Sequence, residues 1–177
     1  MRRRLTGFCG VALAVAVLLL AASPVAANSD PHRAFLPAGP FDLPGGTYCD
    51  FTVHMDVLAD REYATSTSLP DGSTVLTVTG SLMLAATNVD TSKTVVVNAG
   101  GPGTFTFLPD GTTAIGTFLG RALFWAPNLT DYGFPSNVVM TAGPAVVTEE
   151  FAGDGSFTFT SFKGHPQLLT DVCGALS

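Results

Sequence analysis

The stretch TYCDFTVHMDV, residues 47–57, alternates between apolar and polar side chains from Cys49 onward. Its apolar positions are Cys49, Phe51, Val53, Met55 and Val57. Its polar positions are Asp50, Thr52, His54 and Asp56. Because successive side chains of a β-strand point to opposite faces of a sheet, this period of two predicts a strand with one buried and one solvated face.

Similar runs follow along the rest of the chain, short, rich in Val, Thr and Phe, and separated by Gly, Pro, Asp and Asn. They cover residues 74–79, 82–87, 94–98, 104–108, 113–119, 122–125, 138–141, 145–151 and 156–162. The best helix candidate is a single turn at residues 170–176. The pattern predicts an all-β fold, an antiparallel sandwich or small barrel of about 8–10 short strands.

A short repeat punctuates these runs. LPDGST at residues 69–74 recurs as LPDGTT at 108–113, and DGS at 154–156 is a shorter copy. Each copy is followed by a strand-like run and then by Gly80, Gly120 or Gly164. We interpret the unit as a hairpin turn, a strand and a glycine bend. Calcium binding is the alternative, but each turn offers one carboxylate whereas calcium takes about 6–8 oxygens.

This repeat, the GGPG break at residues 100–103 and the DVC motif at residues 171–173 resemble small secreted β-rich proteins of actinobacteria that have no assigned function. The resemblance covers most of residues 47–177. It implies an exported all-β domain and carries over no catalytic residues.

The first 27 residues have the composition of a cleavable signal peptide. Three arginines at positions 2–4 precede an apolar run that ends in small residues, and Pro24 breaks it. Val25 and Ala27 are small enough for cleavage before Asn28. An uncleaved anchor is the alternative, since about 18 apolar residues can span a bilayer. We therefore expect a signal peptide at 1–27, a Pro/Gly-rich lead-in segment at 28–46 and a single all-β domain at 47–177.

The charge of the exported chain limits its partners. The leader carries three of the eight basic residues and none of the fourteen acidic ones, so residues 28–177 have a formal charge of −9. An acidic surface repels nucleic acid and anionic membranes. We expect neither as a partner, and no membrane span after cleavage.

Only Cys49 and Cys173 remain after cleavage. Two cysteines in an oxidising compartment predict a disulfide. Two free thiols or a metal pair are the alternatives, and neither cysteine has a His or a second Cys at ligand spacing.

The chain offers few groups for catalysis. Its histidines are His32, His54 and His165, and no two have metal-ligand spacing. His54 shares a strand face with Asp50 and Asp56, which we interpret as a solvated polar face and not as a catalytic dyad. Glu149 and Glu150 are adjacent on a predicted strand, so they point to opposite faces. The sequence predicts no catalytic residues, no metal and no cofactor.

Residue types that are rare in this chain indicate where a ligand would bind. Arg121 and the single tryptophan, Trp125, lie four positions apart, hence on one face of a regular strand. They are the predicted ligand site, with a structural role for Arg121 as the alternative. Pairs of phenylalanines at 105/107 and 157/159 fill a core or line a barrel cavity. We expect a secreted, non-enzymatic module that binds an unknown extracellular ligand or envelope component. The alternative is a small exported enzyme whose site is assembled from distant strands.

Overall fold

The computed structural model describes residues 33–177, so the predicted signal peptide and its cleavage site lie outside the described residues. The described part contains fourteen strands, a 3₁₀ helix, η1 (Leu129–Tyr132), and an α-helix, α1 (Val172–Leu176). All strand pairs are antiparallel. The predicted all-β antiparallel class is confirmed, and α1 coincides with the predicted helical turn.

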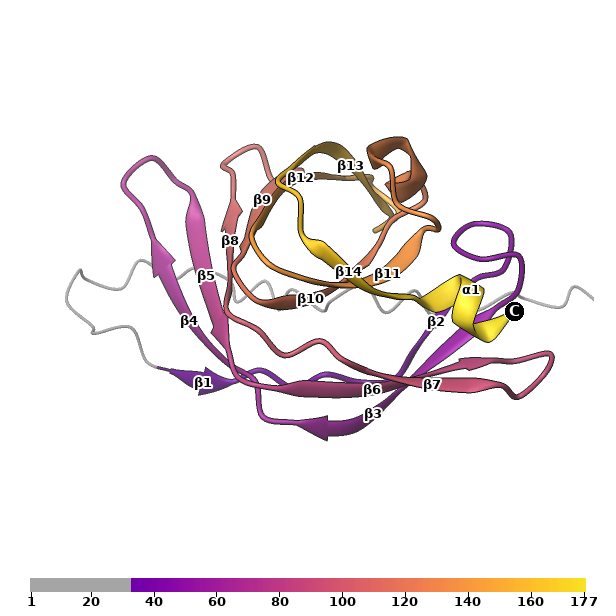
Figure 1. Ribbon diagram of the computed structural model, residues 1–177. Helices are drawn as coiled ribbons and strands as arrows, with labels where there is room; N and C mark the ends of the chain where they lie inside the picture. Colours follow the sequence, from indigo (N-terminus) through magenta and orange to yellow (C-terminus); the bar gives the residue numbers. More distant parts are fainter. Residues whose placement is uncertain (1–32) are drawn as a thin grey trace, which may run out of the picture.

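The strands form three sheets (Figure 1). Sheet A has the order β1 (Ala34–Phe35), β4 (Tyr63–Ser68), β5 (Thr74–Thr79), β8 (Gly103–Phe107), β9 (Thr113–Phe118), β12 (Ala145–Phe151) and β13 (Phe157–Lys163). Sheet B has the order β2 (Phe41–Leu43), β3 (Val53–Asp60), β6 (Leu82–Asn88) and β7 (Thr94–Asn98). Sheet C has the order β10 (Arg121–Trp125), β11 (Val138–Ala142) and β14 (Gln167–Asp171). In these residues β1 and β13 are free edges of sheet A, so the fold is not a closed barrel.

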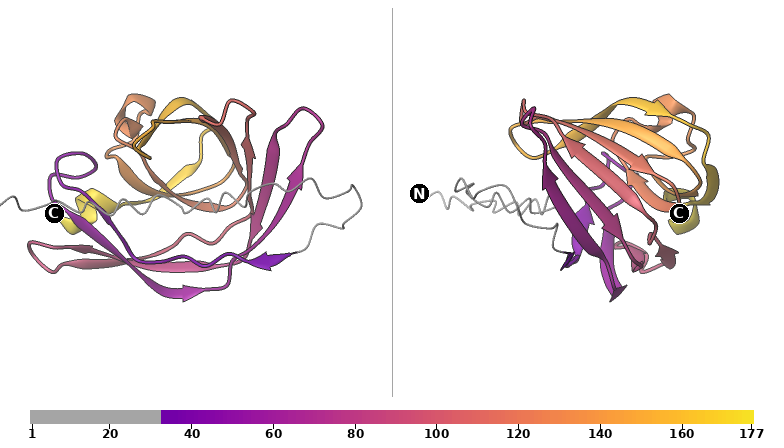
Figure 2. Two further views of the ribbon diagram at one scale, coloured as in Figure 1. Left: turned by 180° about the vertical axis from the view of Figure 1, so that it is seen from behind. Right: turned by 90° about the vertical axis from the view of Figure 1, so that its left-hand side faces the viewer.

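Every second connection between consecutive strands is a short corner that takes the chain from one sheet into another. The β3–β4 segment pairs along its whole length with β5–β6, in sheet B through β3 and β6 and in sheet A through β4 and β5. At the corner, the backbone N–H of Arg61 donates to the carbonyl of Ser81 at 2.9 Å, so the ladder continues through the bend. The chain is therefore an up-and-down meander of bent strands, curled over itself as Figure 2 shows.

Glycine makes these corners possible. Gly80 lies between β5 and β6 with φ +137°, and a Cβ on it would lie 2.1 Å from the carbonyl oxygen of Arg61. Gly120 and Gly164 occupy the equivalent corners of β9–β10 and β13–β14. The predicted bends after each Asp-Gly turn are confirmed.

The three Asp-Gly turns connect neighbouring strands of sheet A. In each turn the aspartate Oδ1 accepts a hydrogen bond of 2.9 Å from the backbone N–H two residues later. The pairs are Asp71 with Ser73, Asp110 with Thr112 and Asp154 with Ser156. The following glycines, Gly72, Gly111 and Gly155, have positive φ. The hairpin interpretation is confirmed, and hydrogen bonds to these turn residues lower the pKa of all three aspartates.

Two apolar clusters fill the fold. The first lies between sheets B and C and includes Val53, Met55, Val138 and Leu176. The second lies inside the curl of sheet A and is centred on Phe124 of β10. α1 packs against β6, β7 and β11, which closes the first cluster at one end.

The number of strands exceeds the prediction. The structure adds β1 and β2 within the Pro/Gly-rich segment at 28–46, as well as β4 and β14. Pro and Gly obscure the strand propensity of the first two, and four of the six residues of β4 are Ser or Thr, without apolar alternation. These elements depend on pairing with distant strands rather than on their own sequence.

Candidate functional site

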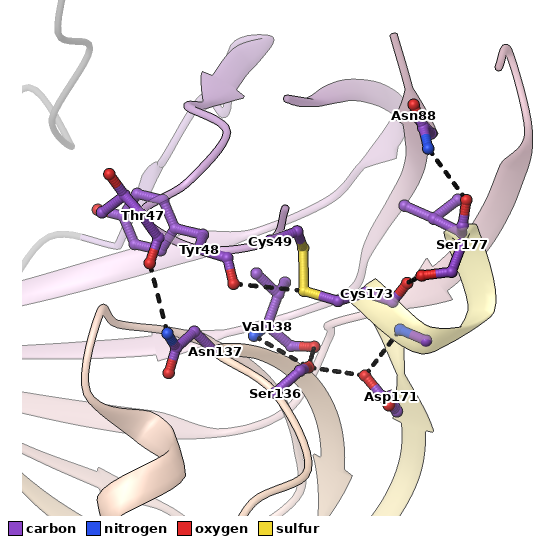
Figure 3. Close-up of a disulfide and its surroundings, with 12 residues drawn as sticks. Thr47, Tyr48, Cys49, Asn88, Ser136, Asn137, Val138, Asp171, Cys173 and Ser177 are labelled. Carbon is purple, nitrogen blue, oxygen red and sulfur yellow. Dashed lines mark hydrogen bonds between the residues drawn. A yellow bond between two sulfur atoms is a disulfide. The ribbon is translucent and has the colours of Figure 1, made fainter. Parts of the chain in front are cut away.

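The disulfide joins the loop before β3 to the helix that ends the described chain. Cys49 and Cys173 are bonded with their Cα atoms 5.5 Å apart, as predicted. Both residues are buried, and the Cys173 Sγ lies 3.4 Å from the carbonyl oxygen of Tyr48. Figure 3 shows that three segments meet here: the 47–49 loop, the 136–138 segment and α1.

Hydrogen bonds fasten the same junction. The Ser136 hydroxyl lies 2.6 Å from Oδ1 of Asp171, and this oxygen also accepts from the backbone N–H of Gly174, capping α1. Asn137 Nδ2 donates to the carbonyls of Pro127 at 3.0 Å and Thr47 at 3.4 Å. The Ser136–Asp171 bond therefore holds the 136–138 segment to α1, and Asn137 joins this segment to the 47–49 loop.

A hollow of about 360 Å³ opens at this junction, lined by residues 46–51 and 135–137 and by Asp171, Cys173 and Gly174, among others. Neither His54 nor His165 lines it. The Ser136 hydroxyl is thus paired with a helix-capping carboxylate, and the hydrogen bonds of Ser136, Asn137 and Asp171 hold the fold together at this hollow.

His54 forms an ion-pair cluster with a partner that sequence alternation did not identify. Its Nδ1 lies 2.6 Å from Oδ1 of Asp42 on β2, and its Nε2 lies 3.3 Å from Oδ1 of Asp56. The hydrogen bond to Asp42 is the largest cause of a raised His54 pKa. With a carboxylate at each nitrogen, the ring joins β2 to β3 on the outer face of sheet B, and this arrangement favours its protonated form.

Glu149 and Glu150 point to opposite faces, as predicted. Glu149 lies on the buried side of β12 together with Val147, and burial raises its pKa to about 7. Glu150 is exposed. The pKa of Glu62, at the β3–β4 corner, is also raised to about 7, by burial first and by the Asp60 charge second. These are the described carboxyl groups with the most strongly raised pKa values.

The structure places Arg121 and Trp125 at the two ends of β10, with buried Leu123 between them on the same face. Arg121 is exposed. The Trp125 ring packs at 5.5 Å from Phe41 and 6.3 Å from Phe157. The ligand site at these two residues stays a prediction.

The phenylalanines noted in the sequence pack against one another. Phe105 contacts Phe118 edge to face at 5.4 Å, and Phe157 and Phe159 lie 6.0 Å apart. None of the four predicted phenylalanines lines either of the two hollows described here.

A second hollow lies at the edge of sheet A and was not predicted. It has a volume of about 270 Å³ and is lined by Arg33, Tyr63, Thr65, Thr77 and Thr79. The Arg33 guanidinium carbon lies 4.5 Å from the centroid of the Tyr63 ring, and one guanidinium nitrogen donates to the Thr79 hydroxyl at 3.4 Å. This hollow combines a cation, an exposed aromatic ring and hydroxyl groups.

Phe35 extends this surface. It pairs with Tyr63 across β1 and β4, and the two rings meet edge to face at 5.8 Å. Phe35 is 51% exposed and Tyr63 38% exposed. Sequence reasoning missed the site because Arg33 and Phe35 lie in the Pro/Gly-rich segment, and only the β1–β4 register brings them to Tyr63. The one signal in the sequence that could have identified this site is that the chain contains few arginines, of which Arg33 is one.

No family model, curated protein or solved structure matches this chain. The resemblance to small secreted actinobacterial proteins stays a prediction. Within residues 33–177, no helix is long and apolar enough to cross a membrane. The same residues contain no group of three or more His, Cys, Asp or Glu arranged to hold a metal ion.

Proposed function

We propose that this protein is a secreted, non-enzymatic binding module, and that the hollow at Arg33 and Tyr63 binds an anionic group of an extracellular ligand. The observation that carries this proposal is the guanidinium held over an exposed ring beside threonine hydroxyls. A guanidinium has five N–H donors, and a planar carboxylate accepts two of them in parallel. One nitrogen bonds to Thr79, which fixes the orientation of the group.

The aromatic pair supports a binding role for the same surface. Tyr63 orients Arg33 through a cation–π contact, which is worth about 0.5–1 kcal/mol at an exposed position. Phe35 and Tyr63 leave apolar surface open beside this cation. Apolar area next to a few well-placed polar groups is typical of sites that take small molecules and sugars.

Export follows from the leader and agrees with the disulfide. Disulfides persist in oxidising compartments such as the extracellular space, and the structure contains the Cys49–Cys173 bond. We propose cleavage before Asn28. The intact mass of protein recovered from the medium tests this step, and recovery only from membranes with the leader attached would refute it.

Titration with glucuronate, a carboxylated monosaccharide, tests the binding site. In NMR spectra of the mature protein, the Tyr63 ring signals should shift saturably with glucuronate, and Arg33→Gln should abolish the shift. Arg121→Gln is the matched control, since it removes the same charge from an exposed residue. If Arg121→Gln abolishes binding and Arg33→Gln does not, the ligand site is the one at Arg121 and Trp125.

One observation favours the enzymatic alternative. The Glu149 carboxyl has a pKa raised to about 7, and such a group can donate a proton at neutral pH. A screen for hydrolysis of extracellular polysaccharides tests it. Turnover that is lost in Glu149→Gln and kept in Glu150→Gln would replace the binding proposal with a hydrolase.

A further inference from the structure

The Arg33 hollow lies at one end of a row of threonines on the outer face of sheet A. Thr65 is opposite Thr77, Thr77 is opposite Thr104, and Thr104 is opposite Thr117. Residues directly opposite each other in antiparallel strands point to the same face. Four neighbouring strands, β4, β5, β8 and β9, therefore present four hydroxyls side by side, about 4.8 Å apart.

The row continues to a second cation. Thr117 is opposite Val146, and Val146 is opposite Lys163, which is exposed. From Thr65 to Lys163 there are five strand-to-strand steps, a span of about 24 Å. Arg33 lines the hollow next to Thr65, so the row has one cation at each end.

Within residues 33–177, the side chains of Thr65, Thr77, Thr104 and Thr117 form none of the side-chain hydrogen bonds, whereas Thr87 and Thr94 on sheet B bond to each other at 2.9 Å. Each hydroxyl of the row can donate one hydrogen bond and accept two. These are the groups that recognise sugar hydroxyls.

The charge of this face is opposite to that of the chain. The strands of sheet A contain two acidic residues, of which Glu149 faces the interior and Glu150 faces outward. The remaining acids lie outside these strands, among them Asp71, Asp110 and Asp154 in the turns at one end of sheet A and Glu62 at the β3–β4 corner. Exposed charges farther away than the Debye length, about 8 Å at physiological salt, are largely screened. An anion that lies along the row is therefore within reach of Arg33 and Lys163, while exposed carboxylates farther away than this length act on it weakly.

We infer that the threonine row and Lys163 extend the Arg33 hollow into a site for an extended polysaccharide that carries spaced carboxylates. Its sugar hydroxyls bond to the threonine hydroxyls, and carboxylates pair with Arg33 and Lys163. Nucleic acid fits poorly, because duplex DNA carries one charge per about 1.7 Å while this site has two cations at the ends of a row that spans about 24 Å. The inference rests on the proposed function, since it uses the same Arg33 hollow.

Hyaluronan oligosaccharides, with one carboxylate per disaccharide, are the probe. We expect affinity for the mature protein to rise from the tetrasaccharide until the oligomer spans about 24 Å, and then to level off. Chitin oligosaccharides of equal length lack the carboxylates and should bind more weakly.

Lys163→Gln should weaken binding of the hyaluronan decasaccharide by about fivefold, the size of one exposed ion pair. The triple variant Thr77→Val, Thr104→Val, Thr117→Val should weaken it by about tenfold.

Matched control variants distinguish loss of the binding site from a change in net charge and from a loss of folding. Lys93→Gln removes the same charge from the β6–β7 turn, and Thr94→Val removes an exposed hydroxyl from sheet B, so both should bind hyaluronan as the parent does. Valine keeps the β-branched shape of threonine, and unfolding curves verify the fold of each variant. If Lys163→Gln and the triple variant bind the decasaccharide normally while Arg33→Gln does not, the row is not part of the site and only the proposed function stands. If Arg33→Gln also has no effect on glucuronate, the proposed function fails as well.

Discussion

The Nδ1 atom of His54 lies 2.6 Å from Oδ1 of Asp42, which joins β3 to a short strand in the Pro/Gly-rich segment. The contact favours the charged imidazole, so the His54 pKa is higher in the folded protein than in the unfolded chain. Its stabilisation is fully present below the ordinary pKa of about 6.5 and is lost as the pH rises through the folded value.

We therefore predict that His54→Gln lowers the free energy of unfolding at about pH 5.5 and has less effect at about pH 9. The loss should not exceed about 1 kcal/mol, because the pair is exposed. Urea unfolding at both pH values measures it. His165→Gln is the control, since His165 is exposed and forms no ion pair among the described residues. Equal losses at both pH values for His54→Gln would contradict the prediction.

Glu149 also makes the protein less stable as the pH rises, because burial disfavours its charged form in the folded state. Burial raises its pKa to about 7, so between about pH 4.5 and pH 7 the folded protein holds a proton that the unfolded chain has released. The free energy of unfolding falls over this window as the pH rises. We predict that Glu149→Gln, which keeps the shape and removes the titration, stabilises the protein at pH 8 by on the order of 1–3 kcal/mol.

The neighbouring glutamate is a matched control for this measurement. Glu150 is exposed on the other face of β12, so Glu150→Gln should change the free energy of unfolding by less than about 0.5 kcal/mol. Urea unfolding at pH 4 and pH 8 compares the two variants. A stabilisation by Glu149→Gln that is the same at both pH values would show that the carboxyl does not titrate as described.

The disulfide provides the third prediction. It closes a loop of 124 residues, and the chain-entropy model assigns such a loop a stabilisation of about 4–5 kcal/mol, of which measured bonds often deliver about 2–4. The paired variant Cys49→Ser, Cys173→Ser should melt several degrees below the parent. Reducing agent should lower the melting temperature of the parent by a similar amount and leave the variant unchanged. Two thiols titrating in the untreated parent would contradict the bond.

The sequence pattern predicted those parts of the fold that depend on residues close together in the chain. The alternation around Val53 and Met55 predicts β3, and the Asp-Gly dipeptides predict the turns, because side-chain period and backbone φ are properties of neighbouring residues. The Cys49–Cys173 pairing followed because two cysteines allow one bond. The sheet order was not predictable in this way, since it depends on which distant strands pair.

The candidate site depends on those distant pairings. Arg33 and Phe35 meet Tyr63 only through the register of β1 with β4, and the threonine row exists only because β4, β5, β8 and β9 are neighbours. Each threonine alone is an ordinary strand residue. The same reasoning explains why strand alternation places His54 on one face with Asp50 and Asp56 but does not identify Asp42, which is its partner in the sheet.

The glycine corner between β5 and β6 gives the last prediction. A Cβ on Gly80 would clash with the carbonyl oxygen of Arg61 and lie 2.8 Å from Cα of Glu62, and both are backbone atoms of the adjoining β3–β4 corner. Its φ of +137° is also a conformation that L-residues rarely adopt. We predict that Gly80→Ala destabilises the protein by more than about 3 kcal/mol, through the clash together with backbone strain of about 1–3 kcal/mol. Gly153→Ala is the control, because Gly153 lies in an exposed turn with no atom within 4 Å of an added Cβ. Thermal unfolding of the two variants separates the outcomes, and a Gly80→Ala protein that melts with the parent would show that the corner can relax and that glycine is not required there.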